Sequence, residues 1–528
     1  MSVNRNVFKL WAPDWLIKGV LIFCMLHCMV LLGIYSSNMT YSASFLDVET
    51  EDLQFAMSLT YGTFLATLMV ESRIFKFFPP RNYFIGVFLC AALTFIASAY
   101  TNDYILFCVL RVLEGVLMAL PWVPLRILLL TRFKSRNATI LVFSFTYGML
   151  LMASPFIMSI VVWLLDNYDW TFMAYGSAFF QLLCVTLILL TFNGNRFHRK
   201  TPLYQIDWTS FILVHAAIIC GAFVLVYGEK KYWFQSPQIV IATITTCITS
   251  SLFIVRQLLQ KRPFFDLSVF RYPNLRTGVV LFILFYISRS TLNICHVTMS
   301  KVWDWEPSRI ANLQYFNVAG DFIGIIIAGI LMSKRFPTRY IFVIGFTLMA
   351  ISHFWFTFLF VPDVSFYSIS LPYVLQGIAV GILFVPLVLF VVSSVPSHFA
   401  PYAGTMGASG RFWGNTIGFS LMQNIQVILQ QNHITKLQQS VIAESPEIQN
   451  RIAQATQSFV SKGFMPDQAY VLAMKQLSGV LKKQAILLSN MEIFTFMGFG
   501  LLIVVFLLLI NRHLRQSFDI FKNRIWGS

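Results

Sequence analysis

Charged residues are scarce in this chain. Only 11% of its 528 residues are Asp, Glu, Lys or Arg, whereas about 25% is usual for a soluble domain. The hydrophobic fraction is 57% and the mean hydropathy is +0.70, both well above the soluble range. This shortage of charge excludes an ordinary soluble globular protein and indicates a membrane protein.

Several functional signatures are also missing. The eight cysteines lie in or beside apolar runs and form neither a disulfide framework nor a CxxC metal pattern. The phosphate-binding pattern G-x-x-x-x-G-K-[ST] is absent, which argues against ATP as an energy source. No nucleophile with a base is evident, and no soluble basic face accompanies the net charge of +16. We therefore expect no enzyme activity, no cofactor, no metal and no nucleic-acid partner.

The apolar residues occur in long blocks. Each block is about 20 residues or more with few charges, which suits a helix crossing a hydrocarbon core of about 30 Å rather than an alternating barrel strand. We therefore predict an all-α polytopic fold. The expected spans are 17–38, 53–72, 83–100, 103–130, 138–164, 169–192, 207–227, 236–256, 277–300, 309–332, 340–361, 366–393, 402–430 and 486–511, fourteen in all.

Loop charges predict the orientation. With the N-terminus inside, most Lys and Arg of the short loops fall on the cytoplasmic side, and Asp47, Glu49, Glu51 and Asp52 gather outside. Both termini are then cytoplasmic, in a multi-pass protein of the inner membrane. A polar segment at about 431–485 lies outside. It is either an extramembrane helical hairpin without chemistry or a docking surface for a periplasmic partner.

The chain contains an internal repeat. FPPRNYFIG (78–86) recurs as FPTRYIFVIG (336–345), and VLEGVLMALPWVPL (112–125) recurs as VLQGIAVGILFVPL (374–387). The two offsets, 258 and 262 residues, nearly agree. We interpret this as a duplicated six-helix unit, which is typical of two-bundle transporters. The predicted domains are an N-terminal bundle (1–200), two inserted helices (201–260) and a C-terminal bundle (261–528).

These features resemble a known family. Two six-helix bundles, each with a basic turn after its second helix, are similar to the major facilitator superfamily, and fourteen spans are similar to its EmrB-like drug/proton antiporter branch. The stretches RVLEG (111–115), DWTFMAYG (169–176), QIDWTSFILV (205–214) and RPFFDLSVFRYPNLRTG (262–278) carry the match. The resemblance implies proton-coupled efflux of lipophilic or cationic small molecules by alternating access, with the proton gradient as energy source and membrane lipid as surroundings.

The chain also departs from that family. No acid lies between Lys18 and Asp47, where many relatives carry an Asp in the first span, and the loop motif after the second span is degenerate. These departures leave open a dedicated transporter of one metabolite, lipid or siderophore. A membrane enzyme or scaffold is a more remote alternative. A membrane-fusion protein and an outer-membrane channel would be the partners if efflux is tripartite.

Ionisable residues inside spans are functional candidates because burying a charge there costs about 2.5–3.5 kcal/mol. Arg111 and Glu114 lie three residues apart and can pair on one helix face. Their repeat positions hold Tyr373 and Gln376, which favours a role specific to the first half. In related antiporters the matching Arg is tied to proton transfer. The candidates for proton coupling or transport are Arg111, Glu114, Asp321, Arg289 and Arg411, and Asp321 could pair with Arg289 or with Arg411.

Two further groups are structural candidates. The repeated basic turns predict gating positions, and prolines or spaced glycines within helices predict kinks and close packing. The gating candidates are Glu71, Arg73, Arg81, Lys334 and Arg339. The kink and packing candidates are Pro155, Gly410, Gly414 and Gly418. Aromatic residues make up 16% of the chain and could line a cavity or face lipid.

Overall fold

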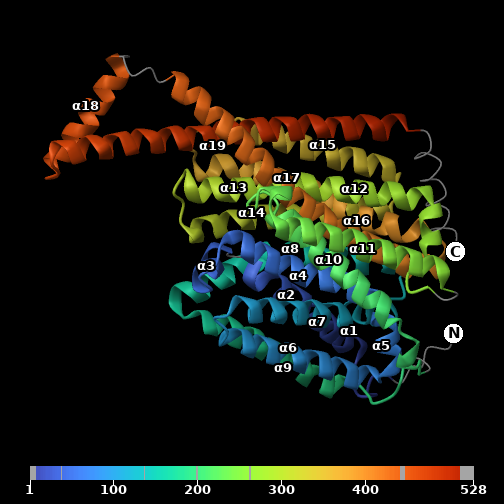
Figure 1. Cartoon of the computed structure of the whole chain (residues 1–528). Helices are drawn as coiled ribbons and strands as arrows, with labels where there is room; N and C mark the ends of the chain where they lie inside the picture. Colours follow the sequence, from blue (N-terminus) through green and yellow to red (C-terminus); the bar gives the residue numbers. More distant parts are fainter. Residues whose placement is uncertain are drawn as a thin grey trace.

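A computed structural model describes residues 7–36, 39–135, 137–197, 200–260, 263–440 and 446–511. These residues form helices joined by short turns, and the one β-type contact within them is a bridge between Phe8 and Phe192. The helices lie roughly side by side in a long bundle, from which α18 and the adjoining ends of α17 and α19 protrude (Figure 1). The start of α1 and the end of α19 lie at the opposite end (Figure 1).

The N-terminal half contributes nine helices to the described residues. They are α1 (Asp14–Met25), α2 (His27–Ser36), α3 (Met39–Phe45), α4 (Thr50–Leu68), α5 (Glu71–Phe77), α6 (Pro80–Ala99), α7 (Tyr104–Leu130), α8 (Ala138–Asn167) and α9 (Trp170–Thr191). The inserted pair is α10 (Trp208–Tyr227) and α11 (Pro237–Leu259). The C-terminal half contributes α12 (Pro273–Arg289), α13 (Thr291–Lys301), α14 (Pro307–Ser333), α15 (Thr338–Thr357), α16 (Phe366–Ser393), α17 (Ala400–Ser440), α18 (Pro446–Ser461) and α19 (Pro466–Ile510).

Membrane-spanning candidates are numerous. Eleven helices of the described residues are long and apolar enough to span, and two bent pairs bring the number to thirteen. The thirteenth predicted span, 402–430, lies within α17, whose many polar residues keep it below that level of apolarity. The second predicted span bends by 63° where α4 meets α5, and the fifth bends by 40° within α8. The all-α polytopic prediction is confirmed.

The repeated basic turn begins a helix in both halves. Pro79 and Pro80 stand at the cap and first turn of α6, and Pro337 caps α15. Proline suits these positions because its fixed φ matches the helix start and its missing N–H has no partner to lose. The carbonyls of Pro79 and Pro337 accept the first helical hydrogen bonds, from Tyr83 N and Ile341 N.

The glycine of the second repeat permits a close helix crossing. Gly115 of α7 lies against Thr60 and Thr63 of α4, and an added Cβ would collide with both. Its repeat position, Gly377 of α16, lies against the backbone of Asn317 and Asp321 in α14 in the same way. The VL-(Glu/Gln)-Gly repeat therefore encodes one crossing used in both halves, because glycine lets the two backbones approach.

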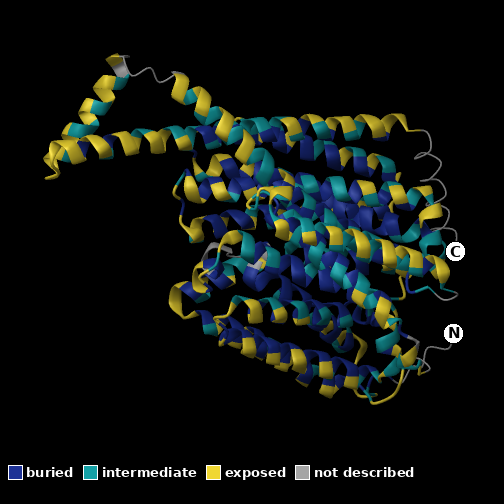
Figure 2. Cartoon of the chain, viewed as in Figure 1, coloured by how far each residue is buried: buried dark blue, intermediate teal, exposed yellow. Residues whose placement is uncertain are grey.

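The outward faces of the bundle are apolar and exposed, and buried residues fill its interior (Figure 2). Buried side chains of α8, including Ile140, Phe143 and Leu151, share a packed cluster with Ile325 and Ala328 of α14. Apolar packing therefore joins the two halves here, and the contact region between the halves is called the seam.

The inserted helix α10 lies across this seam. An added Cβ on Gly62 of α4 would collide with Ile218 of α10, and one on Gly221 of α10 would approach Trp413 of α17 to 2.7 Å. At the α18 end of the bundle, Tyr227 Oη donates to Asp52 Oδ1 at 2.5 Å. The α10–α11 pair is therefore docked on both halves.

The other end of the pair is held by Asp207. Arg256 donates to its carboxylate at 2.9 and 3.1 Å, and Gln260 at 2.9 Å. Partial burial raises the pKa of Asp207, but hydrogen bonds from Arg256, Ser210 and Gln260 outweigh it and hold that pKa well below its usual range. This cluster explains the QIDWTS stretch that opens the pair.

Candidate functional site

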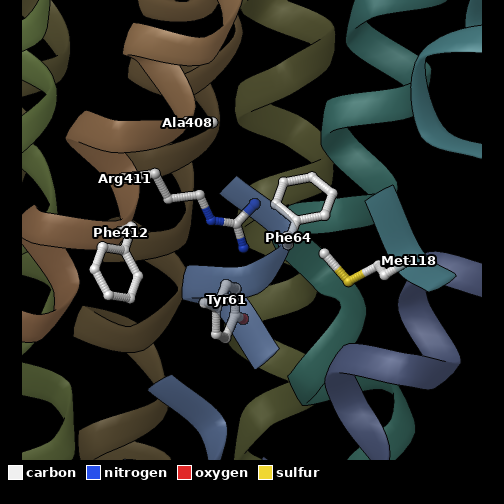
Figure 3. A pocket seen from close by; sticks show the side chains of 6 residues that line it. All are labelled: Tyr61, Phe64, Met118, Ala408, Arg411 and Phe412. Carbon is white, nitrogen blue, oxygen red and sulfur yellow. The ribbon is translucent and has the colours of Figure 1, made fainter. Parts of the chain in front are cut away.

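A small cavity lies at the seam between the halves. Its walls come from α4, α7 and α17, and the side chain of Arg411 points into it (Figure 3). The lining residues are Tyr61, Phe64, Met118, Ala408, Arg411 and Phe412. The cavity measures about 10 Å³, space for about one water molecule. The structure therefore holds this part of the seam closed, because a drug-sized ligand needs roughly 300 Å³ or more.

The guanidinium of Arg411 lies between the rings of Tyr61 and Tyr286, which are together called here the aromatic frame. Its guanidinium lies 5.4 Å from the ring centre of Tyr61 and 5.8 Å from that of Tyr286. Within the described part of the chain, no carboxylate lies within 4.0 Å of it. A positive charge therefore faces the seam from the C-terminal half, surrounded by tyrosines rather than paired with a carboxylate.

Arg111 and Glu114 form an ion pair in the middle of α7, as their spacing predicted, and both side chains are fully buried. The guanidinium lies over the rings of Tyr35 and Phe107, at 4.0 and 4.9 Å. Two nitrogens of Arg111 and Oε2 of Glu114 have no hydrogen-bond partner among the described residues. Glu114 precedes Met118 by one helical turn, so the pair lies one turn from the cavity wall.

The repeat positions in α16 use a neutral arrangement instead. Tyr373 and Gln376 are buried, and Asn317 Nδ2 of α14 donates to Gln376 Oε1 at 2.6 Å and to Tyr373 O at 3.0 Å. These two positions of the crossing therefore need no charge, although the buried Asp321 of α14 lies at the same crossing. The ion pair of the first half is an addition to the shared helix geometry rather than a requirement of it.

Asp321 does not form the expected ion pair. Its carboxylate is fully buried, and neither oxygen has a hydrogen-bond partner or a cation within 4.0 Å among the described residues. Arg289, at the end of α12, instead donates to Leu151 O of α8 at 3.4 Å, across the seam. Arg411 lies in its aromatic frame. Neither possible pair forms within 4.0 Å, because Arg289 reaches across the seam to α8 and Arg411 lies between the rings of Tyr61 and Tyr286.

The predicted gating residues occupy the turns as follows. Glu71 is buried at the start of α5, while Arg81 and Arg339 are half-buried in the first turns of α6 and α15. Lys334 is exposed at the end of α14, and Arg73 is half-buried in α5. Arg81 and Arg339 each leave Nε without a hydrogen-bond partner among the described residues, a matching feature of the two repeats.

The kink and packing candidates lie in two helices. Pro155 stands directly after the 40° bend of α8, where its ring and missing N–H interrupt the helical ladder. On α17, Gly414 and Gly418 face Ile283 and Ile287 of α12, whose Cα atoms lie 3.0 Å from the sites of an added Cβ. A Cβ added to Gly410 would lie 3.3 Å from Cβ of Phe282, which also belongs to α12.

Sequence reasoning missed the rings around Arg111 and Arg411 and the partners of His27, a residue that it regarded as packed or hydrogen-bonded rather than titrating. His27 of α2 is buried between Gln181 Oε1 at 2.6 Å and Leu117 O at 3.2 Å. Tyr35 of the same helix covers Arg111 and hydrogen-bonds to Ser98 Oγ at 2.8 Å. No local pattern marks them, since their partners lie on helices far away in sequence.

No family model matches the chain. It is 23% identical over 437 residues to the multidrug export protein EmrB of Haemophilus influenzae, covering 80% of this chain and 82% of the relative. It is 24% identical over 401 residues to EmrB of Escherichia coli strain K12, covering 75% of each. The solved major facilitator superfamily proton:xylose symporter XylE has a TM-score of 0.50 at 11% identity, covering 89% of this chain and 94% of that one. The chain is therefore a multi-pass membrane transporter with the major facilitator fold, related over most of its length to the EmrB multidrug export proteins.

Proposed function

We propose that this transporter exports lipophilic and amphipathic compounds across the inner membrane, with both termini in the cytoplasm and the proton gradient as energy source. Support comes from the EmrB relatives, whose names state multidrug export. The observation that carries the proposal is the buried Arg111–Glu114 pair, which occurs in one half only. If the pair only held helices together, neutral residues such as Tyr373 and Gln376, which occupy the same positions in the other half, would serve equally well.

The coupling step follows because a proton and the guanidinium of Arg111 compete for the carboxylate of Glu114. Glu114 is neutral when it holds a proton, and its attraction to Arg111 is then lost. When Arg111 pairs with it again, the proton leaves. Because the pair lies one turn from Met118 in the cavity wall, rocking of the bundles would open Glu114 to one side of the membrane at a time. Each cycle would then carry a proton inward and a substrate outward.

The cavity narrows the substrate class. Tyr61, Phe64 and Phe412 offer flat apolar surfaces, and Arg411 adds a positive charge with no acid within 4.0 Å in the described part of the chain. Such a wall attracts an aromatic or aliphatic body bearing an acidic group, and it repels a cation. The proposal therefore favours neutral and acidic lipophilic compounds over the cationic ones.

The protruding helices are the proposed contact with a membrane-fusion protein. The end of α17, all of α18 and the first part of α19 extend beyond the bundle (Figure 1). In α18 the apolar residues Ile452, Phe459 and Val460 alternate with polar ones at helical spacing. Ile452 and Phe459 are half-buried where α18 packs on α19, so a partner would bind the exposed surface of these helices and extend the export path outward.

The test is export from energised cells, measured with a fluorescent lipophilic acid and a matched lipophilic cation. The native chain is compared with Glu114→Gln and with Glu306→Gln, which removes an exposed carboxyl near α14, and each rate is normalised to folded protein. We expect the native chain and the control to export the acid until the proton gradient is collapsed, and Glu114→Gln to export at background level. Acid export that survives both gradient collapse and Glu114→Gln would refute the coupling.

A further inference from the structure

A second, larger depression lies on the lipid-facing side of the inserted pair. It measures about 560 Å³, within the range of drug-sized ligand sites. Its walls belong to α4, α10 and α11, and they are formed by Phe55, Ile219, Cys220, Phe223, Gln238, Ile241, Ala242 and Thr245. This groove is separate from the cavity around Arg411, which shares none of these residues.

The groove opens toward the bilayer. In the most apolar stretch of α11, only 6% of the residues are buried within the protein. Ile241, on the groove wall, is 65% exposed. A helix exposed to this degree faces hydrocarbon, so only molecules dissolved in the membrane can reach the groove from that side. The inner wall is aromatic, where Phe55 of α4 and Phe223 of α10 meet edge to face with ring centres 5.6 Å apart.

The polar groups of the groove are largely satisfied within the protein. Thr245 Oγ1 donates to Ile241 O at 2.8 Å, and Lys231 Nζ donates to Gln238 Oε1 at 2.5 Å. A ligand inside the groove is therefore offered apolar contact and little hydrogen bonding. An alkyl chain meets that description, because it gains from leaving neighbouring lipid only by filling shaped space.

The mouth of the groove carries a positive charge that no carboxylate among the described residues pairs with. Lys230 and Lys231 adjoin the end of α10, and Lys230 pairs with Glu49. Lys231 has no acid within 4.0 Å in the described ranges of the chain and reaches Gln238 at the groove rim. Glu229 is the acid beside it, and burial together with the charge of Glu51 raises the pKa of Glu229 above its usual value. An acidic headgroup at the groove rim would therefore meet Lys231 without a competing carboxylate within 4.0 Å among the described residues.

We propose that this groove binds a single-chain acidic amphiphile from the surrounding leaflet, with its alkyl chain between α10 and α11 and its carboxylate at Lys231. The site adjoins the seam, since Phe55 and the cavity residue Tyr61 belong to one packed cluster with Phe412. Its occupancy is a binding property, so it stands independently of the proposed export.

The experiment uses the full chain in lipid bilayers with a fatty acid that carries a photoactivatable diazirine on its chain. Adducts are mapped by mass spectrometry. We expect them at 219–223 and 238–245, with several-fold less labelling in Ile241→Trp. The matched control is Ile248→Trp, two turns along α11 on the same exposed face and outside the groove. Both side chains are exposed on the outer face of α11, so neither tryptophan should disturb the packing of the protein core.

The role of Lys231 is tested with the corresponding diazirine alcohol. Lys231→Gln should reduce labelling by the acid several-fold and leave labelling by the alcohol unchanged. An even spread of adducts along α11, or equal labelling in Ile241→Trp and the native chain, would overturn the site. Equal loss for acid and alcohol in Lys231→Gln would overturn the headgroup assignment. None of these outcomes depends on whether the protein exports anything.

Discussion

At the scale of single residues, the ion pair of α7 is the unusual feature. Arg111 and Glu114 are both fully buried in a span, where two charges survive only by neutralising each other. Their contact was predictable because three residues on a helix place two side chains on one face. The ring of Tyr35 over Arg111 was not, since α2 and α7 meet only in the folded bundle.

The pair should show strong energetic coupling. Arg111→Gln leaves a buried carboxylate without its partner, and Glu114→Gln leaves a buried guanidinium, so each should lower stability by roughly 3–5 kcal/mol. The double variant Arg111→Gln/Glu114→Gln leaves no charge and should lose less than either single variant. Thermal unfolding in detergent, followed by tryptophan fluorescence, measures this. Losses that simply add would show that the two residues do not depend on each other.

At the scale of helices, glycine determines how closely neighbours approach. Gly320 and Gly324 of α14 face Gly377 and Gly381 of α16, and each would bring an added Cβ against the backbone of the other helix. The sequence shows these glycines four apart on both helices, the same spacing that drew attention to Gly410, Gly414 and Gly418. This spacing predicts that the helix has a flat face on which another helix can pack closely. It does not say which helix occupies it, because that depends on tertiary packing.

Gly381→Ala tests this crossing. Its Cβ would press on the backbone of Asp321 and Ile325, so the helices must separate, and we expect a loss of about 1–3 kcal/mol. Gly404→Ala in α17 is the control, because nothing lies within 4 Å of its added Cβ. There the better helix propensity of alanine should leave stability equal or higher by up to about 1 kcal/mol. Melting of both variants in the same detergent decides the matter, and equal melting temperatures would contradict the close crossing.

At the scale of the whole molecule, polar contacts at the α18 end join the C-terminal half to the N-terminal half and to the turn between α10 and α11. Gln423 Nε2 of α17 donates to Glu51 Oε1 of α4 at 3.2 Å, and Trp233 Nε1 donates to Asn424 Oδ1 at 3.0 Å. The sequence predicted two repeated halves from short motifs. The contacts between them were beyond prediction, because residues 51 and 423 share no local pattern and the repeat describes each half separately.

A cross-link at this position should stop transport if the halves rock. The pair Glu51→Cys/Gln423→Cys, oxidised to a disulfide, joins α4 to α17 across the seam. Thr357→Cys/Thr495→Cys joins α15 to α19 within one half, where the two hydroxyl oxygens lie 3.4 Å apart, and serves as the matched control. We expect export to cease in the first pair and return on reduction, with the control and the oxidised native chain unaffected. Full export through the locked seam would argue against rocking.

The docking of α10 has a further consequence for the speed of the cycle. Ile218 of α10 packs beside Gly62 in one half, and Trp413 of the other half packs beside Gly221. Any rotation of the halves must therefore shear α10 against one of them. Because α11 packs on α10 and its apolar stretch is mostly exposed, it would have to move through the bilayer during each turnover. Membrane viscosity then acts as friction on the cycle, so stiffer lipid should slow turnover even where substrate and gradient stay the same.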